Sequence, residues 1–176
     1  TFIFEKTKYG WVWAHAYQFD ENTATFIVEC AQETFDKFGF ADLSQEESIK
    51  ICEEIFKDHL SGHALMTNAN HIRGSAWIRF PRVLCEKWHY KNIVLLGDSA
   101  ATAHFSIGSG TKLAMESAIE LADCIEVESH LSKAFDKYEA TRRLDVLRLQ
   151  SAARNSVEWF EDVERYLDLD PTQLNY

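Results

Sequence analysis

Hydrophobic and polar positions alternate through most of the first thirty residues. The alternation covers residues 2–6, 11–19 and 24–30, and short polar segments separate these three runs. Alternation with a period of two is typical of strands with one buried face, and short breaks with turn-forming residues favour hairpins. The pattern therefore predicts a three-stranded antiparallel sheet. One face of the second strand carries large rings: Trp11, Trp13, His15, Tyr17 and Phe19.

This aromatic face has two interpretations. It either bounds a site for a planar aromatic ligand or packs against a covering element, as aromatic side chains commonly do in protein cores. The role of His15 is open in the same way, since a polar ring on this face either approaches a ligand or is a hydrogen-bonded core histidine.

The hydrophobic period changes to that of a helix after Ser44. Ser44 and Glu47 form a capping-box pattern, and apolar residues then recur at helical spacing until Gly62. We expect this helix to cover the sheet. Residues 66–71 and 75–80 predict further strands around Arg73 and Gly74. The apolar residues of the helix are Ile49, Cys52, Ile55, Phe56 and Leu60.

Residues 92–116 follow a different order. Residues 93–96 are a short apolar run that predicts a fully buried strand, and Gly97 and Asp98 follow it directly. A loop with Gly108 and Gly110 comes next, and residues 111–125 have helical spacing. We expect one apolar face on this helix, formed by Leu113, Ala114, Ala118, Leu121, Ala122 and Ile125.

Residues 131–167 contain no Gly or Pro and predict one long or broken helix. The overall fold class is therefore α+β. It consists of an antiparallel or mixed sheet with a covering helix, then a strand, loop and helix of the kind found in nucleotide-binding domains, and a long C-terminal helix. We divide the chain at residues 1–91, 92–130 and 131–176.

The strand, loop and helix of residues 92–116 predict a site for a polar or anionic cofactor. Ligands of open α/β sheets bind beyond the carboxyl ends of the strands, where the Asp98 carboxylate can accept hydrogen bonds from hydroxyl groups. The first turn of the following helix directs free N–H groups and a positive dipole end at the loop. Gly108 and Gly110 allow a ligand to approach the main chain closely.

These residues resemble the second flavin-binding motif of the single-component flavoprotein aromatic monooxygenases, whose fold is typified by p-hydroxybenzoate hydroxylase. Gly97 and Asp98 match the Gly-Asp of that family, and the resemblance implies that Asp98 binds the ribityl chain of FAD. The glycine loop matches the segment beside the flavin ring. The resemblance implies that the cofactor-binding residues are Gly97, Asp98, Ile107, Gly108, Ser109, Gly110, Thr111 and Lys112.

Residues 104–114 narrow the resemblance to a subgroup that hydroxylates aromatic acyl-CoA thioesters, such as salicylyl-CoA 5-hydroxylase. The segments 11–17, 24–30, 77–80 and 156–161 are similar to that subgroup in the same order. The resemblance implies FAD as cofactor, NADH or NADPH as reductant, and a role for His104 in catalysis as a substrate-positioning or proton-shuttling group. It implies that His15 and Phe105 contact an aromatic substrate.

Three positions depart from the pattern of the broader family. It usually has His at Ala101, Pro at Phe105 and Asn at Lys112. Phe105 and Lys112 agree with the acyl-CoA subgroup, whereas Ala101 departs from both patterns. Arg73, Arg79 and Arg82 offer planar guanidinium groups for a CoA phosphate or a substrate carboxylate, and surface ion pairs are their alternative role.

The dinucleotide cradle that usually accompanies this motif is missing. No Gly-x-Gly-x-x-Gly follows an opening strand, and the chain begins at Thr1. We therefore expect an internal fragment that lacks the amino-terminal FAD half of a longer monooxygenase.

Two further classes of function stay open. One is a non-catalytic module that binds a nucleotide, CoA or another chain, including an inactive truncated fragment. The other is a hydrolase that uses Asp98, His104 and either Ser106 or Ser109, although no Gly-x-Ser-x-Gly elbow is present.

Composition limits the partners. A net charge of -10 without a visible basic patch disfavours nucleic acid and anionic membranes, and no apolar run is long enough to span a bilayer. The four cysteines have no metal-binding spacing, so we expect no metal and reduced thiols in a cytoplasmic protein. The sequence leaves a homodimer open.

Overall fold

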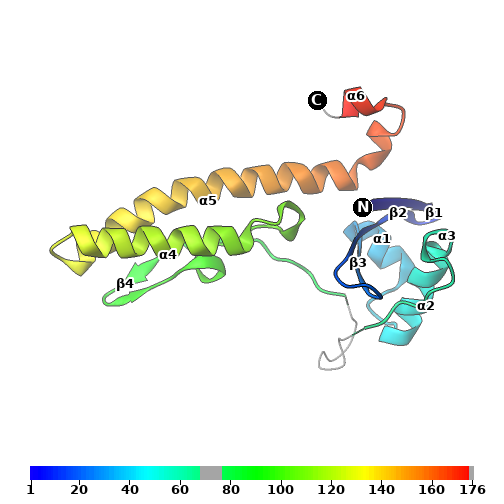
Figure 1. Ribbon diagram of the computed structural model, residues 1–176, viewed down its shortest axis with the longest axis horizontal. Coiled ribbons are helices and arrows are strands. Elements are labelled where there is room, and N and C mark those ends of the chain that lie inside the picture. The colour runs from blue at the N-terminus through cyan, green and yellow to red at the C-terminus, as the bar shows by residue number, and fades with distance from the viewer. Residues whose placement is uncertain (68–76, 175–176) are drawn as a thin grey trace. The chain divides into compact units, whose positions relative to one another are not determined.

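A computed structural model describes residues 1–67 and 77–174 of the chain (Figure 1). The chain divides into two compact units. The first contains Thr1–Arg79 and Glu161–Tyr176, and the second contains Phe80–Phe160.

The first unit contains a three-stranded antiparallel sheet in the order β1, β2, β3. The strands are β1 (Phe2–Thr7), β2 (Gly10–Gln18) and β3 (Ala24–Cys30). In this register Trp13 of β2 lies opposite Phe4 of β1 and Glu29 of β3. The two hairpins predicted from the alternating pattern are confirmed.

Three helices follow the sheet: α1 (Gln32–Phe38), α2 (Gln45–Ile55) and α3 (Lys57–Leu60). Phe56, between α2 and α3, packs in a fully buried core with Val12 and Ala14 of β2. Because side chains alternate along a strand, one face of β2 contacts the helices, and Trp11, Trp13 and His15 form the opposite face. The prediction of a covering helix is confirmed.

The details of these helices differ from the sequence prediction. The capping box is present, because the Ser44 side chain accepts from the Glu47 N–H at 3.2 Å and Glu47 accepts from the Ser44 N–H at 2.9 Å. The helix stops at Ile55, however, and α3 is a separate turn. Helix α1 was not predicted, since its seven residues are too short to show a clear helical period.

The strand predicted over residues 75–80 is wrong for its described part, residues 77–80, which form no strand. Trp77 packs instead against the rings of Phe40 and Phe35, with centroid distances of 4.5 and 5.8 Å. An aromatic cluster thus buries the ring that suggested a strand. Residues 66–67 also form no strand, and the remainder of both predicted strands lies outside the described residues.

The C-terminal part of the first unit contains the 3-10 turn η4 (Val163–Tyr166) and the short helix α6 (Pro171–Leu174). Val163 is buried, and Glu164 forms an ion pair with Lys6 of β1. These contacts tie the turn to the edge of the sheet.

The second unit contains two long helices, α4 (Gly110–Val127) and α5 (Leu131–Glu161), which run antiparallel side by side (Figure 1). A hairpin of β4 (His89–Tyr90) and β5 (Ile93–Val94) accompanies them. The long C-terminal helix predicted from the sequence is confirmed, with a break at Asp162 before η4. The buried core consists of Trp88, Ala100, Ala101, Leu113, Cys124, Ala134, Tyr138 and Val146.

The prediction of a fully buried strand over residues 93–96 is wrong. Strand β5 has two residues, pairs antiparallel with β4, and leaves Ile93 63% exposed. The Leu95 N–H donates to Trp88 O at 2.6 Å, and the Tyr138 hydroxyl donates to Leu95 O at 3.1 Å. A helix side chain thus satisfies the backbone where a further strand was expected, because a short apolar run does not specify its partner.

The apolar face predicted for α4 is also partly wrong. Leu113, Ser117 and Cys124 are buried, whereas Ala118, Ala122 and Ile125 are exposed. The buried stripe includes the small side chains Ser117 and Cys124, which carry little hydrophobic signal. Among the described residues, no helix is long and apolar enough to cross a membrane.

Removal of the α2 capping box tests how much this cap contributes to the stability of the first unit. Ser44→Ala removes the acceptor of the Glu47 N–H, so we expect a loss of about 1 kcal/mol in the free energy of unfolding. Urea denaturation followed by circular dichroism measures it. Lys50→Ala, at an exposed position of the same helix, is the control. Equal stability of the two variants contradicts a structural role for the cap.

Candidate functional site

Gly97 and Asp98 lie in a 3-10 turn, η2 (Gly97–Ser99), that packs against α4. Gly97 has a φ of +59°, and a Cβ placed on it lies 3.1 Å from the Ala114 Cβ. Glycine is favoured here because a side chain would strain the left-handed backbone and would have to displace Ala114. The neighbouring Asp98 is exposed, so its carboxylate is accessible beside the first turns of α4.

The N-terminus of α4 has no side-chain cap. The Ser109 hydroxyl donates to Ile107 O at 3.0 Å rather than accepting from the helix. The first N–H groups, those of Gly110, Thr111 and Lys112, consequently receive no capping acceptor from Ser109. Gly108 adopts a φ of +61°, and no atom lies within 4 Å of a Cβ placed on it. An acceptor group of a ligand therefore has room to approach these N–H groups.

His104 begins the loop that leads to α4. Its Nδ1 atom lies 3.3 Å from the Ser106 backbone nitrogen, which donates to it, and 3.0 Å from the Ser106 Oγ. The side chain thus caps the 3-10 turn η3 (Phe105–Ile107). Partial burial lowers the pKa of His104 below its usual range, and the ring is therefore neutral at pH 7.

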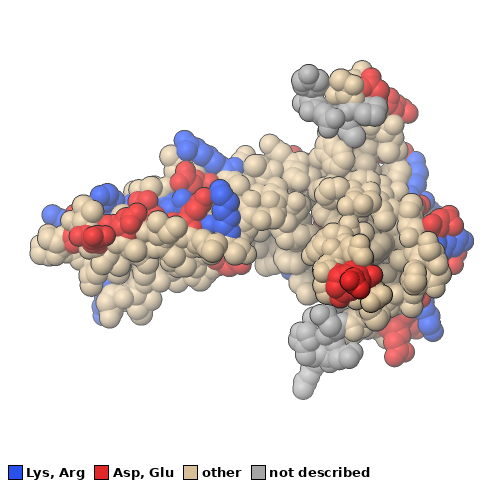
Figure 2. Space-filling model, in the orientation of Figure 1, with Lys and Arg blue, Asp and Glu red and all other residues tan. Residues whose placement is uncertain are grey.

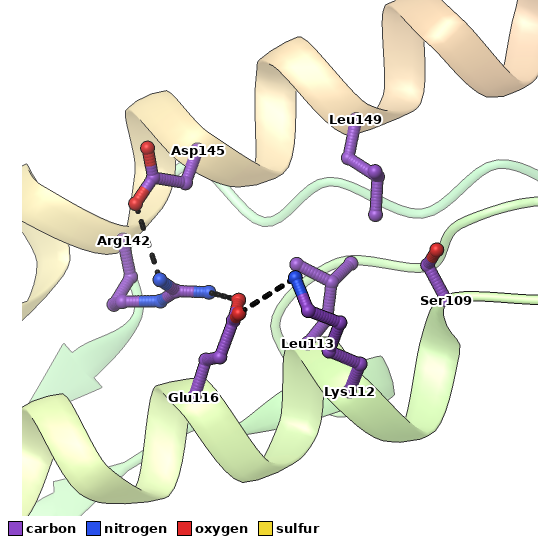
Figure 3. Close-up of a pocket in the computed structure, with 7 residues that line it drawn as sticks. All are labelled: Ser109, Lys112, Leu113, Glu116, Arg142, Asp145 and Leu149. Carbon is purple, nitrogen blue, oxygen red and sulfur yellow. Dashed lines mark hydrogen bonds and ion pairs between the residues drawn. The ribbon is translucent and has the colours of Figure 1, made fainter.

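The two helices line a half-open cavity of about 320 Å³ beside this loop (Figure 3). Figure 3 shows Lys112 and Glu116 of α4 facing Arg142 of α5. Glu116 lies 2.8 Å from the Lys112 Nζ and 3.1 Å from Arg142, and Arg142 lies 3.1 Å from Asp145. The Lys112 and then the Arg142 hydrogen bonds lower the pKa of Glu116. The lining residues are Ser109, Lys112, Leu113, Glu116, Arg142, Asp145 and Leu149.

Charge in this cavity is balanced rather than positive. The Arg142 side chain is 8% exposed, and its Nε atom is buried without a hydrogen-bond partner in the described part of the chain. Lys112 is 74% exposed, but its ammonium group is already paired with Glu116. Lys112 thus supplies a positive charge near the α4 N-terminus that Glu116 partly neutralises.

His15 lies in the first unit, on the aromatic face of β2. Its Nε2 atom lies 2.6 Å from Glu29 Oε1, and both side chains are 13% exposed. Phe2 packs against the His15 ring edge to face, with centroids 4.5 Å apart. Burial raises the pKa of Glu29 to about 7, and hydrogen bonding with Trp13 partly opposes this shift.

The structure thus brings most of the expected cofactor-binding residues into one region of the second unit, around η2 and the start of α4. His104 and Phe105 belong to the loop that enters this region, and their rings stack with centroids 4.6 Å apart. His15 belongs to the other unit. Phe80, whose ring lies 4.9 Å from that of Phe105, was not among the expected site residues.

Glu29, Glu116 and Arg142 were not predicted as site residues either. Alternation placed Glu29 on a face of its strand. The register puts it opposite Trp13, and its contact with His15 is a diagonal one that the sequence does not reveal. Arg142 and Glu116 are 26 residues apart on different helices, and no local spacing signals their ion pair.

The arginines suggested for a phosphate or carboxylate differ in their surroundings. Arg82 is occupied, because its Nε donates to Gln150 at 3.1 Å. Arg79 is exposed, and Arg73 lies outside the described residues.

The alternative hydrolase triad is not assembled. Ser106 contacts His104, but no carboxylate of the described residues does, and Asp98 is not among the partners of His104. In the same part of the chain, no cluster of three or more His, Cys, Asp or Glu side chains is arranged to hold a metal ion. The four cysteines are free.

No family model matches the chain. It is 36% identical to a salicyloyl-CoA 5-hydroxylase from a Streptomyces species, over all of this chain and 35% of that enzyme. It is 34% identical to the protodeoxyviolaceinate monooxygenase of Chromobacterium violaceum, over 92% of this chain and 42% of that enzyme. The chain is homologous to aromatic monooxygenases.

A third relative is the 3-hydroxy-4-methyl-anthranilyl-[aryl-carrier protein] 5-monooxygenase of Streptosporangium sibiricum. It is 36% identical over 95% of this chain and 44% of that enzyme. The chain therefore spans less than half the length of these curated relatives.

The fold resembles that of PqsL, a probable FAD-dependent monooxygenase from Pseudomonas aeruginosa. The TM-score is 0.59 at 18% identity, and the match covers 93% of this chain and 44% of that one. This likeness shows the fold alone.

Gly97 and Gly108 form a matched pair for testing the close approach of η2 to α4. Both have a left-handed φ, which costs a residue with a side chain about 1 to 2 kcal/mol. Only at Gly97 does the new Cβ also meet Ala114. We expect Gly97→Ala to lower the free energy of unfolding by about 1 kcal/mol more than Gly108→Ala, measured by urea denaturation. The reverse order contradicts the packing of η2 on α4.

The buried Glu29 carboxyl predicts a pH-dependent stability. Because its folded pKa is about 7 and the ordinary value is 4.5, its contribution is fully present below pH 4.5 and is lost as pH rises through about 7. Relative to Glu29→Gln, we expect the unmodified chain to lose about 1 to 3 kcal/mol between about pH 5 and pH 8. Denaturant titrations at several pH values measure this difference.

Glu46→Gln, at an exposed position of α2, is the control for that titration. The same pH dependence in the Glu46→Gln and Glu29→Gln variants contradicts a desolvated carboxyl at position 29.

Proposed function

We propose that this chain is part of an FAD-dependent monooxygenase that hydroxylates an aromatic substrate, carried as a thioester of CoA or of a similar carrier. The observation that carries the proposal is the homology to aromatic monooxygenases over the whole chain. Two of those relatives are named for aromatic acyl groups carried by CoA or by an aryl-carrier protein. The activity of this chain alone is not part of the proposal.

The residues around η2 and α4 fit a flavin. A flavin presents hydroxyl groups on its side chain and carbonyl acceptors on its pyrimidine edge. Asp98 is an exposed acceptor, whereas the uncapped N-terminus of α4 offers donors beside the open space at Gly108. These complementary groups lie in neighbouring elements, because η2 packs against α4.

When bound, FAD takes electrons from NADH or NADPH and uses O2 to supply one oxygen atom to the aromatic ring. The residues of this chain would hold and orient the cofactor. Asp98 would accept hydrogen bonds from the cofactor's hydroxyl groups, and the N–H groups of Gly110 and Thr111 would donate to its carbonyl acceptors. Gly97 and Gly108 would let the main chain approach the cofactor closely, and Ile107, Ser109 and Lys112 would complete the loop that holds it.

The charge near the loop supports this assignment. The α4 dipole and Lys112 both favour electron-rich groups at the helix N-terminus. Glu116 moderates this effect, since it pairs with Lys112 at 2.8 Å. His104 and Phe105 lie on the same loop, and we assign them to the substrate side of the site. On the basis of the resemblance alone, we also assign a substrate contact to His15, the polar group of the aromatic sheet face in the first unit.

The four free cysteines suit a reducing compartment, and we place the protein in the cytoplasm. Two of them are chemically quiet, because burial raises the pKa of Cys30 and of Cys52 to about 12. On the face in Figure 2, acidic and basic side chains are interspersed among uncharged ones.

Substrate-stimulated turnover of the intact protein tests the proposal. With benzoyl-CoA or its hydroxylated and aminated analogues, we expect NAD(P)H oxidation to rise at least about tenfold, with transfer of 18O from 18O2 to the ring. The matching free acids serve as the comparison. Equal stimulation by free acids contradicts the thioester class, and the lack of any flavin or any labelled product contradicts a monooxygenase.

A variant pair ties that activity to this chain. Asp98→Asn removes the charge beside α4 and is expected to weaken FAD retention about tenfold, which equilibrium dialysis measures. Asp123→Asn, on an exposed turn of α4, is the control. Unchanged retention in both variants removes Asp98 from the cofactor site.

A further inference from the structure

The His104 ring is fixed by contacts on several sides. It stacks on Phe105 at a centroid distance of 4.6 Å and an interplanar angle of 28°. The Phe80 ring meets it edge to face at 6.1 Å and 72°. The ring centroids of Phe80 and Phe105 are also 4.9 Å apart. The imidazole therefore contacts one aromatic ring by stacking and a second ring edge to face.

The hydrogen bonds of His104 decide which ring nitrogen carries the proton. The Ser106 backbone N–H lies 3.3 Å from Nδ1, and a backbone N–H only donates. Nδ1 must therefore present its lone pair, because a proton there would face the N–H. The Ser106 hydroxyl, 3.0 Å from the same atom, is free to rotate and donates as well. The neutral ring consequently carries its proton on Nε2.

This Nε2–H has no hydrogen-bond partner within the described residues. Burial lowers the pKa of His104, which keeps the ring neutral at pH 7. Protonation of Nδ1 also removes the acceptor of the Ser106 N–H, which caps η3. The ring is thus poorly suited to take up a proton but well suited to offer one hydrogen bond in a fixed direction.

We propose that His104 is a substrate-positioning donor whose Nε2–H binds an oxygen acceptor, the carbonyl of an aromatic acyl group, on a ligand that packs beside Phe80 and Phe105. This inference rests on the proposed function, since that function supplies the aromatic ligand. It assigns Phe80 to the ligand site and excludes proton shuttling by His104.

Phe80 supports this placement of the ligand. Its side chain is 59% exposed although it belongs to the aromatic cluster, so one side of the cluster is open. An aromatic ring with a carbonyl substituent has the two features that the cluster and the donor recognise, a planar apolar surface and an acceptor. The group carried beyond the carbonyl, such as CoA, takes no part in this recognition.

Two substitutions separate the donor from the cap. His104→Asn retains a side-chain oxygen able to accept from the Ser106 N–H, and Asn is a favoured capping residue, but it removes the Nε2 donor. His104→Gln extends an amide N–H toward the position of Nε2 and loses the cap. His104→Asn therefore keeps the cap without the donor, and His104→Gln keeps a donor without the cap.

Binding and stability in the intact flavoprotein distinguish these roles. If His104 is a ligand donor, the Kd for benzoyl-CoA rises about tenfold in His104→Asn, whereas the midpoint of thermal unfolding stays close to that of the native protein. His104→Gln then binds more tightly than His104→Asn despite a lower unfolding midpoint. If His104 only caps the loop, His104→Asn binds like the native protein, and that result overturns the proposal.

The tautomer is measured directly on the intact flavoprotein. A long-range proton–nitrogen correlation spectrum with 15N-labelled histidine is expected to show a neutral ring protonated at Nε2 at pH 7. His104→Asn identifies the signal. A ring protonated at Nδ1, or a charged ring at this pH, overturns the proposal.

Failure of this inference differs from failure of the proposed function. If the His104→Asn flavoprotein hydroxylates the thioester as well as the native protein does, at both saturating and limiting substrate, the function stands and only the donor role is lost. If the intact protein binds no flavin or hydroxylates no aromatic substrate, both the proposed function and the donor role of His104 are contradicted.

Phe80→Leu gives a second test, because it removes the exposed ring of the cluster and keeps an apolar side chain. Binding of benzoyl-CoA about tenfold weaker, with flavin retained, supports the open aromatic cluster. Unchanged binding removes Phe80 from the ligand site.

Discussion

The close approach of η2 to α4 is the constraint on which the candidate site depends. Gly97 adopts a left-handed backbone against Ala114, and no residue with a side chain fits there without displacement. This contact fixes the main chain directly before Asp98 and holds it against the first turns of α4. A carboxylate acceptor and a set of backbone donors thereby come to neighbouring elements, although a loop and the short turn η3 separate them along the chain.

Electrostatics in this region work against the net charge of the chain. The chain carries a net charge of -10, yet the cavity beside the loop is lined by two cations and two anions, and the uncapped N-terminus of α4 adds a positive dipole end. Glu116 and Asp145 hold the buried Arg142 guanidinium and offset its desolvation. Local donors, rather than the overall charge, therefore determine what this region can bind.

Local signals predicted local structure well, whereas predictions that depended on distant partners were less accurate. The strands of the first sheet follow from alternation, and the α2 start follows from Ser44 and Glu47, because the information lies within a few neighbouring residues. The motif at Gly97 and Asp98 was found for the same reason. The apolar run at 93–96, in contrast, did not reveal that a tyrosine of α5 satisfies its backbone. The orientation of α4 and the contact of Glu29 with His15 likewise arise from tertiary contacts, which a hydrophobic pattern does not encode.

The hydrogen bond from Tyr138 to Leu95 has a mechanical consequence. Tyr138 is fully buried on α5, and Leu95 lies two residues before Gly97. This bond joins the backbone of the segment that leads into η2 directly to α5. Asp98 thus follows a segment that is anchored to both long helices, to α4 through Gly97 and to the 31-residue α5 through one phenol group.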